Sequence, residues 1–242
     1  MKESMRIDKL LANMGYGSRK EVKGLLKKGA LTVDGEQIKD GKVHVNPEED
    51  DIEVFGEKVE YKPFIYLMMN KPQGVISATE DANDRTVIDL LETEDLIFEP
   101  FPVGRLDKDT TGFMFLTNDG KLAHQLTSPK KKVDKTYLVN INELLTKEDE
   151  EELEAGVILD DGYLTKPAKL SYLGEETSTT LHLTITEGKF HQVKRMFQAV
   201  GKEVVALKRE SIGPLQLDPE LALGTYRELT EEELEQLRTR QS

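Results

Sequence analysis

The chain has 242 residues, no cysteine and a formal net charge of −13 at pH 7. Its 37% hydrophobic and 33% charged residues are typical of a folded protein with a packed core, and the lack of cysteine excludes disulfides, a thiolate zinc site and a cysteine nucleophile. No apolar run approaches the ~18–20 residues of a membrane span. The N-terminal segment is amphipathic, so we expect no export signal and a cytoplasmic protein.

The first 60 residues show the pattern of a small domain with two helices and a few short strands. Apolar residues spaced i, i+3, i+4 and i+7 predict a helix over 5–14. Ser18 and Glu21 form a capping box that opens a second helix, which Gly29 ends. Asp34-Gly35 between two short apolar runs predicts a tight hairpin, and a strand is expected over 51–55.

The remaining chain reads as a larger domain that follows a polar linker at about 56–64. Strands are predicted over 65–69, 113–117, 136–142, 168–173 and 179–186, and helices over 86–92, 120–127, 146–154, 190–200 and 230–239. The elements show no regular β-α-β alternation. We therefore predict an α+β fold with a mixed or mostly antiparallel sheet, divided into domains 1–60 and 61–242.

Basic residues are clustered in spite of the acidic total. They outnumber acidic residues in 1–42, 121–137 and 187–209, whereas the acids concentrate in 48–60, 147–154 and 231–235. Because local charge and not the sum attracts a polyanion, these patches are compatible with nucleic-acid binding.

The most informative stretch runs from residue 102 to 120 and contains Gly104-Arg105-Leu106-Asp107 followed by Thr110-Thr111-Gly112. An ionised group such as Asp107 beside an apolar run costs free energy, so we expect it to have a function. The stretch resembles the catalytic motif of pseudouridine synthases, specifically the RsuA/RluB branch, in which this aspartate is essential. The resemblance implies that Asp107 is the catalytic carboxylate, acting as nucleophile, base or charge stabiliser.

Two further motifs extend the resemblance. Lys135-Thr136-Tyr137 is similar to the family's second motif, which implies that Tyr137 packs on the target base. The segment 187–197 is similar to the third, which implies that Lys194, or less readily Arg195, pairs with Asp107 and keeps it ionised. Asn70-Lys71-Pro72 resembles the first motif, a structural element to which we assign no chemistry.

The N-terminal order of helix, helix, hairpin and strand resembles the S4 (αL) RNA-binding domain. The candidate RNA contacts lie in the basic patches and near the catalytic motif: Arg6, Arg19, Lys20, Lys23, Lys27, Arg105, Lys130, Lys131, Lys132, His191 and Arg195. Arg105 is expected to hold a phosphate or to fill the gap left by a flipped base.

The resemblance implies a cofactor-free and metal-free isomerase that flips one uridine out of ribosomal RNA and converts it to pseudouridine. Segment 190–197 looks more like the small-subunit (16S) enzymes. The partner is ribosomal RNA, free or in a partly assembled particle, with no obligate protein partner inferred. Three alternatives remain open: 23S RNA as substrate, a non-catalytic RNA-binding protein, and a glycoside hydrolase. The last needs two carboxylates, and Asp109 looks like a turn residue.

Overall fold

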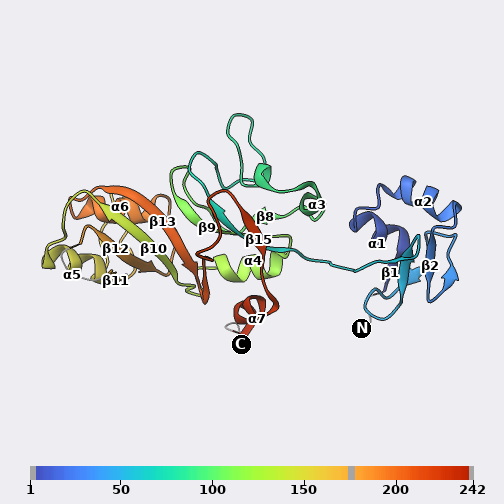
Figure 1. The fold of residues 1–242 in the computed structure, drawn as a ribbon. Coiled ribbons are helices and arrows are strands. Elements are labelled where there is room, and N and C mark those ends of the chain that lie inside the picture. Colours follow the sequence, from blue (N-terminus) through green and yellow to red (C-terminus); the bar gives the residue numbers. More distant parts are fainter. Residues whose placement is uncertain (1–3, 174–177, 240–242) are drawn as a thin grey trace. The chain divides into compact units, whose positions relative to one another are not determined.

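The computed structural model describes residues 4–173 and 178–239 (Figure 1). Its contacts divide the chain into two compact units. The first comprises the residues up to Ile65 together with Glu92–Glu99, and the second comprises Tyr66–Leu91 and the chain from Pro100 onward. The sequence did not predict that Glu92–Glu99 groups with the first unit.

The first unit contains two helices, α1 (Ile7–Asn13) and α2 (Arg19–Lys27), and two small sheets. β1 (Met5–Arg6) pairs with β4 (His44–Val45), and the order in the second sheet is β3 (Glu36–Gln37), β2 (Leu31–Val33), β5 (Ile52–Val54) and β6 (Glu57–Lys58). The helix predicted over 5–14 begins at Ile7 because Met5 and Arg6 belong to β1. The predicted linker at 56–64 is wrong at its start, because residues 57–58 form β6.

Local sequence signals explain how these elements begin and turn. Ser18 Oγ accepts from the backbone N–H of Glu21, whose carboxylate accepts from the Ser18 N–H at 2.7 Å, which confirms the predicted capping box. Asp34 and Gly35 have φ angles of 51° and 78°, so the β2–β3 hairpin has the expected tight turn. Apolar residues of both helices and of the strands form one core.

The second unit is built on a nine-stranded sheet. Seven strands follow the order β11 (Lys169–Tyr172), β12 (Thr180–Ile185), β10 (Lys135–Ile141), β13 (Val204–Ile212), β9 (Thr111–Thr117), β7 (Tyr66–Lys71) and β15 (Tyr226–Glu228). Two short strands complete it, β8 (Phe101–Pro102) on β9 and β14 (Leu215–Gln216) on β13. All pairs are antiparallel except β9–β13, which is parallel. The α+β class with a mixed sheet is confirmed.

Helices α4 (Gly120–Thr127), α5 (Lys147–Ala155), α6 (Gln192–Ala199) and α7 (Glu231–Thr239) accompany the sheet, and all four agree with predicted helices within two residues. α5 packs on β11 and α6 on β13 (Figure 1). The helix predicted over 86–92 is wrong. A single 3₁₀ turn, Ile88–Leu90, ends where Leu91 becomes extended, and α3 (Thr93–Leu96) follows.

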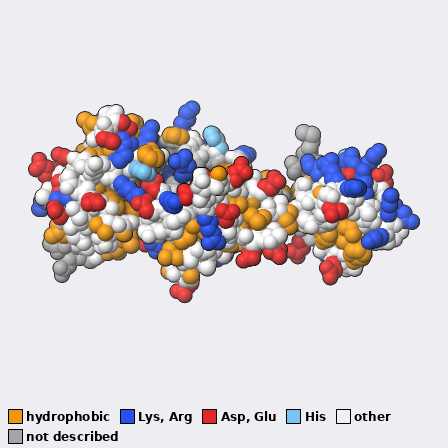
Figure 2. All heavy atoms as spheres, turned by 90° about the horizontal axis from the view of Figure 1, so that it is seen from above, with side chains coloured by type: hydrophobic (Ala, Val, Ile, Leu, Met, Phe, Trp, Pro, Cys, Tyr) orange, Lys and Arg blue, Asp and Glu red, His pale blue; other side chains and the backbone are white. Residues whose placement is uncertain are grey.

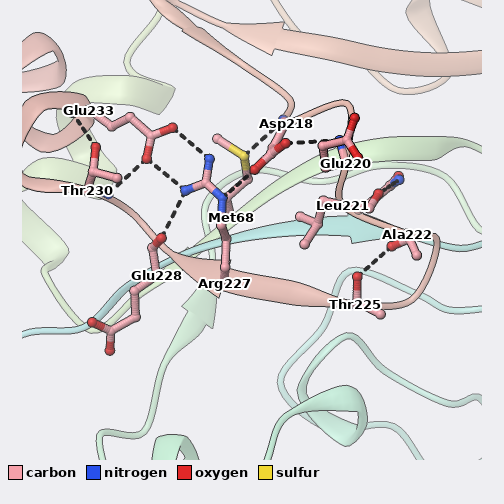
Figure 3. A network of polar contacts seen from close by, with 11 residues as sticks. Met68, Asp218, Glu220, Leu221, Ala222, Thr225, Arg227, Glu228, Thr230 and Glu233 are labelled. Atoms are coloured by element: carbon pink, nitrogen blue, oxygen red, sulfur yellow. Dashed lines mark hydrogen bonds and ion pairs between the residues drawn. The ribbon is translucent and has the colours of Figure 1, made fainter.

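Arg227 of β15 fastens the C-terminal helix to the sheet (Figure 3). Its guanidinium donates to both carboxylate oxygens of Glu233 in α7 at 2.8 Å and to Asp218 at 2.7 Å. These bonds lower the pKa of the Glu233 and Asp218 carboxyls. In the residues that the structure describes, no helix is long and apolar enough to cross a membrane.

Candidate active site

Asp107 lies in the loop that connects β8 to β9, and a neighbouring segment holds this loop by its backbone. The ammonium of the fully buried Lys71, at the end of β7, donates to the carbonyl oxygens of Asp107 at 3.0 Å and Thr110 at 2.9 Å. Burial lowers the pKa of Lys71 to about 8. Ser77 Oγ also binds the loop, accepting from the Leu106 N–H and donating to its carbonyl at 3.0 Å.

These bonds fix the backbone around Asp107 and leave its carboxylate, a quarter exposed, to other partners. Lys194 Nζ from α6 lies 3.4 Å from Asp107 Oδ2, and His191 Nε2 lies 3.5 Å from Oδ1. The third motif therefore brings two side chains to the catalytic candidate from one helix start. His191 itself has a φ of 48°, a left-handed conformation that a non-glycine residue rarely adopts, so the helix begins only at Gln192.

Lys194 contacts a second carboxylate in addition to that of Asp107. Its closer partner is Asp109, whose Oδ1 lies 2.5 Å from Nζ, and this bond lowers the pKa of the Asp109 carboxyl. The sequence interpretation of Asp109 as a turn residue missed this role. The result is an ammonium shared by two carboxylates two residues apart in one loop.

A buried carboxylate organises the start of α6. Glu187 is 6% exposed and accepts from the Tyr163 hydroxyl at 2.7 Å, the Lys166 N–H at 2.9 Å and Gln192 Nε2 at 2.7 Å. Gln192 Oε1 in turn accepts from the Lys189 N–H. This network ties the 188–192 turn to the loop after α5, and so supports the position of His191 and Lys194. Glu187 is the first residue of the third motif, and the sequence alone did not predict a role for it.

A cavity of about 580 Å³ opens beside Asp107. Asp107, Arg105 and His191 line it together with Tyr137, which lies nearly buried on β10. Lys194 lies outside the lining but in contact with Asp107. The three residues predicted as catalytic are therefore brought to one region, although they come from a loop, a strand and a helix that are far apart in the sequence.

Two cationic residues of the cavity wall were not singled out as site residues from the sequence. Lys135 is half-buried on β10, and Arg209 is 2% exposed on β13. Arg209 lies opposite Tyr137 in the β10–β13 ladder. β13 was not predicted at all, although Arg209 lies in one of the basic patches.

The predicted RNA contacts fall into different surroundings. Arg19, Lys20, Lys23 and Lys27 are exposed on or at the start of α2, and Figure 2 shows Lys and Arg side chains gathered on this unit. Lys130, Lys131 and Lys132 are exposed after α4. Two other candidates already have protein partners: Arg6 binds the buried Asp8 at 2.6 Å, and Arg195 pairs with Asp160 and Asp161.

Among residues 4–173 and 178–239, no group of three or more His, Asp or Glu side chains is placed to hold a metal ion.

Comparison with known proteins identifies both units. The family model for RNA pseudouridylate synthase matches residues 65–199, and the model for the S4 domain matches residues 5–52. An uncharacterized RNA pseudouridine synthase of Bacillus subtilis, YtzG, is 61% identical over 95% of this chain and 97% of its own length. Ribosomal small subunit pseudouridine synthase A of Escherichia coli K12 is 41% identical over 95% of this chain and 98% of its own.

A crystal structure of a pseudouridylate synthase is similar at a TM-score of 0.67 and 37% identity, covering 96% of this chain and 99% of that one. Sequence and fold agree over nearly the whole length. The chain therefore belongs to the RNA pseudouridylate synthase family and is an isomerase.

Proposed function

We propose that this enzyme converts one uridine of small-subunit (16S) ribosomal RNA to pseudouridine, with Asp107 as its essential residue. The observation that carries the proposal is the position of the Asp107 carboxylate at a cavity lined by Tyr137, with Lys194 and His191 within 3.5 Å of its two oxygens. Such a cavity suits a planar ring and a sugar that have left the RNA stack.

The reaction detaches uracil from C1′ of the ribose, turns the ring and rejoins it through C5. Its overall balance requires no redox partner or phosphate donor: the N1–C1′ bond breaks, the C5–C1′ bond forms, C5 loses a proton and N1 gains one. Asp107 acts on the sugar side. Lys194 places a positive charge 3.4 Å from that carboxylate.

Tyr137 provides a face on which the flipped base stacks, an interaction of about 1–3 kcal/mol. Arg105, exposed at the cavity rim two residues before Asp107, holds a phosphate or fills the gap in the RNA stack. The exposed cations of α2 and the lysines after α4 supply backbone-phosphate contacts. Flipping the target uridine out of the stacked RNA costs a few kcal/mol, which these contacts offset.

The choice of ribosomal RNA rests on the relatives. Proteins named ribosomal small subunit pseudouridine synthase A are about 41% identical over 95% of the chain, and the first unit matches an S4 domain. The substrate would therefore be 16S RNA, free or in a partly assembled particle, and the enzyme would act in the cytoplasm.

The test is tritium release from ribosomal RNA labelled at C5 of uridine and lacking the modification. Wild type and Asp107→Asn are compared on 16S RNA, on 23S RNA and on small-subunit particles, with RNA binding measured in parallel. Asparagine keeps the shape of the side chain and removes its charge. We expect release by wild type on a small-subunit substrate and none by the variant, with equal binding.

Each of the other outcomes would support a different conclusion. Release from 23S RNA alone would overturn the small-subunit assignment but keep the chemistry. Release by both proteins would remove Asp107 from its role. No release by wild type on any substrate, with RNA still bound, would leave a non-catalytic RNA-binding protein.

A further inference from the structure

Arg209 is a buried cation with an unused donor. Its side chain is 2% exposed and its Nε donates to the carbonyl oxygen of Phe113 at 2.8 Å. Its Nη2 is buried without a hydrogen-bond partner, and within the described chain Arg209 forms no ion pair. A buried N–H of a charged group that remains unpaired is costly, so a ligand that brings an acceptor to this guanidinium would gain free energy.

The strand register places Arg209 beside Tyr137 at the cavity wall. Tyr137 on β10 pairs directly with Arg209 on β13, and cross-strand partners project from the same face of a sheet about 4.5–5.5 Å apart at Cβ. Arg209 and Tyr137 both line the cavity next to Asp107. A ring stacked on Tyr137 would therefore present an edge to the guanidinium.

A second cation adds to the positive potential at this place. Lys135 lines the same cavity, and its ammonium donates to the Val133 carbonyl at 3.0 Å. Burial, and after it the charge of Arg209, lowers the pKa of Lys135 to about 8. Among the described residues, no carboxylate is bound to Lys135 or to Arg209, and both line the cavity. Such an arrangement favours negative charge beside these two cations.

The isomerisation creates such charge. When the N1–C1′ bond breaks, its electron pair stays on the base and is delocalised onto the carbonyl oxygens O2 and O4, until C5 bonds to C1′ and N1 takes up a proton. A donor fixed in advance at one of these oxygens stabilises the charge that develops there.

We propose that the Arg209 guanidinium donates a hydrogen bond to a carbonyl oxygen of the flipped uracil, with Lys135 adding positive potential beside it. This inference rests on the proposed function and adds recognition of the edge of the base, whereas Tyr137 contacts its face. The donor also selects for a base that carries an acceptor at this edge.

The test combines variants with sulfur substitution at the uridine that wild type modifies. RNAs carrying uridine, 2-thiouridine or 4-thiouridine at that one position are reacted in single turnover with wild type, Arg209→Met, Arg209→Lys and Lys135→Met. Pseudouridine or its thio analogue is quantified by chromatography of nucleosides. Sulfur accepts hydrogen bonds poorly, so it weakens the contact without removing the ring.

We expect sulfur at one of the two oxygens to slow wild type by roughly tenfold. Arg209→Met should be slow on uridine and should show no further loss with that same sulfur, because contacts that act together are not additive. Lys135→Met is the matched control: it should slow all three RNAs but keep the sulfur effect, since Arg209 is still present.

Two results would overturn the inference: wild type insensitive to sulfur at both oxygens, or an equal sulfur effect in wild type and Arg209→Met. If Arg209→Met does not fold, two comparisons still test the inference: wild type on the three RNAs, and Arg209→Lys, which keeps the charge and removes the guanidinium. Because every comparison requires turnover by wild type on uridine, a failure of the proposed function would be seen separately, as no turnover at all.

Discussion

The ammonium of Lys71 donates a 3.0 Å hydrogen bond to the main-chain carbonyl of Asp107. The catalytic candidate is thus held by its backbone from one side, while Lys194 and His191 approach its carboxylate from another. One group positions the Asp107 backbone and other groups contact its carboxylate. Variants of these groups should therefore affect stability and turnover differently.

Lys71→Met should destabilise the second unit. The substitution keeps much of the apolar stem but leaves the carbonyls of Pro72, Asp107 and Thr110 without this donor. We expect a loss of about 1–3 kcal/mol in the free energy of unfolding, measured by urea denaturation at pH 7. Lys108→Met is the control: Lys108 is exposed on the same loop and pairs with Asp84, so its loss should cost less than about 1 kcal/mol. Equal stability of Lys71→Met and wild type would contradict the backbone role.

Lys71 should also shape the dependence of stability on pH. Its pKa is about 8 in the folded protein and 10.5 as the ordinary value, so between these values the unfolded chain binds more protons at this residue. Stability from this group therefore rises with pH over that window, is fully present above 10.5 and is lost as the pH falls through 8. The difference in unfolding free energy between wild type and Lys71→Met should grow from pH 8 to pH 10. A constant difference over that range would show that Lys71 does not titrate there.

Lys194 and Asp109 should differ in their effect on turnover. Lys194→Met removes the cation beside Asp107, and we expect the rate of tritium release to fall by roughly 100-fold. Asp109→Asn removes the other carboxylate, whose side chain is 69% exposed; a solvated ion pair contributes at most about 1 kcal/mol, so a loss below roughly tenfold is expected. If Asp109→Asn were as damaging as Lys194→Met, Lys194 would be acting through Asp109.

Gly112 should tolerate no side chain. It has a φ of +101°, and a Cβ there would lie 2.2 Å from the Arg209 carbonyl oxygen across the β9–β13 pairing. We expect Gly112→Ala to destabilise the protein by about 3 kcal/mol or more, from backbone strain and the clash together. Gly74→Ala is matched in its positive φ of +81° but has no atom within 4 Å of the added Cβ, so it should cost only about 1–2 kcal/mol. Equal melting temperatures for the two variants would exclude the clash as a cause.

The basic face of α2 should govern the salt dependence of RNA binding. Lys23→Gln with Lys27→Gln removes two exposed cations. If both contact phosphates, the slope of log affinity against log salt concentration should decrease by about 1.5. Lys147→Gln with Lys169→Gln removes two exposed lysines, one at the start of the acidic helix α5 and one at the start of β11, which packs on it, and should leave the slope unchanged. An equal change in both double variants would show that only net charge matters.

Short-range patterns were sufficient for several features of the protein. The capping box of Ser18 and Glu21, the Asp34-Gly35 turn and the amphipathic helices depend on neighbours a few residues apart, and the structure agrees with them. The run around Asp107 identified the family for the same reason, since its residues are contiguous.

Long-range pairing decided the rest. The longest described strand, β13, was missed because it alternates poorly in hydrophobicity: it pairs with β10 and β9 and carries the buried Arg209 between Lys208 and Glu210. Three contacts join segments that are far apart in the chain. Lys71 binds the backbone of the Asp107 loop, Lys194 contacts two aspartates, and Arg209 pairs with Tyr137 across neighbouring strands. No local propensity encodes such contacts, because they exist only once the sheet has set which strands are neighbours.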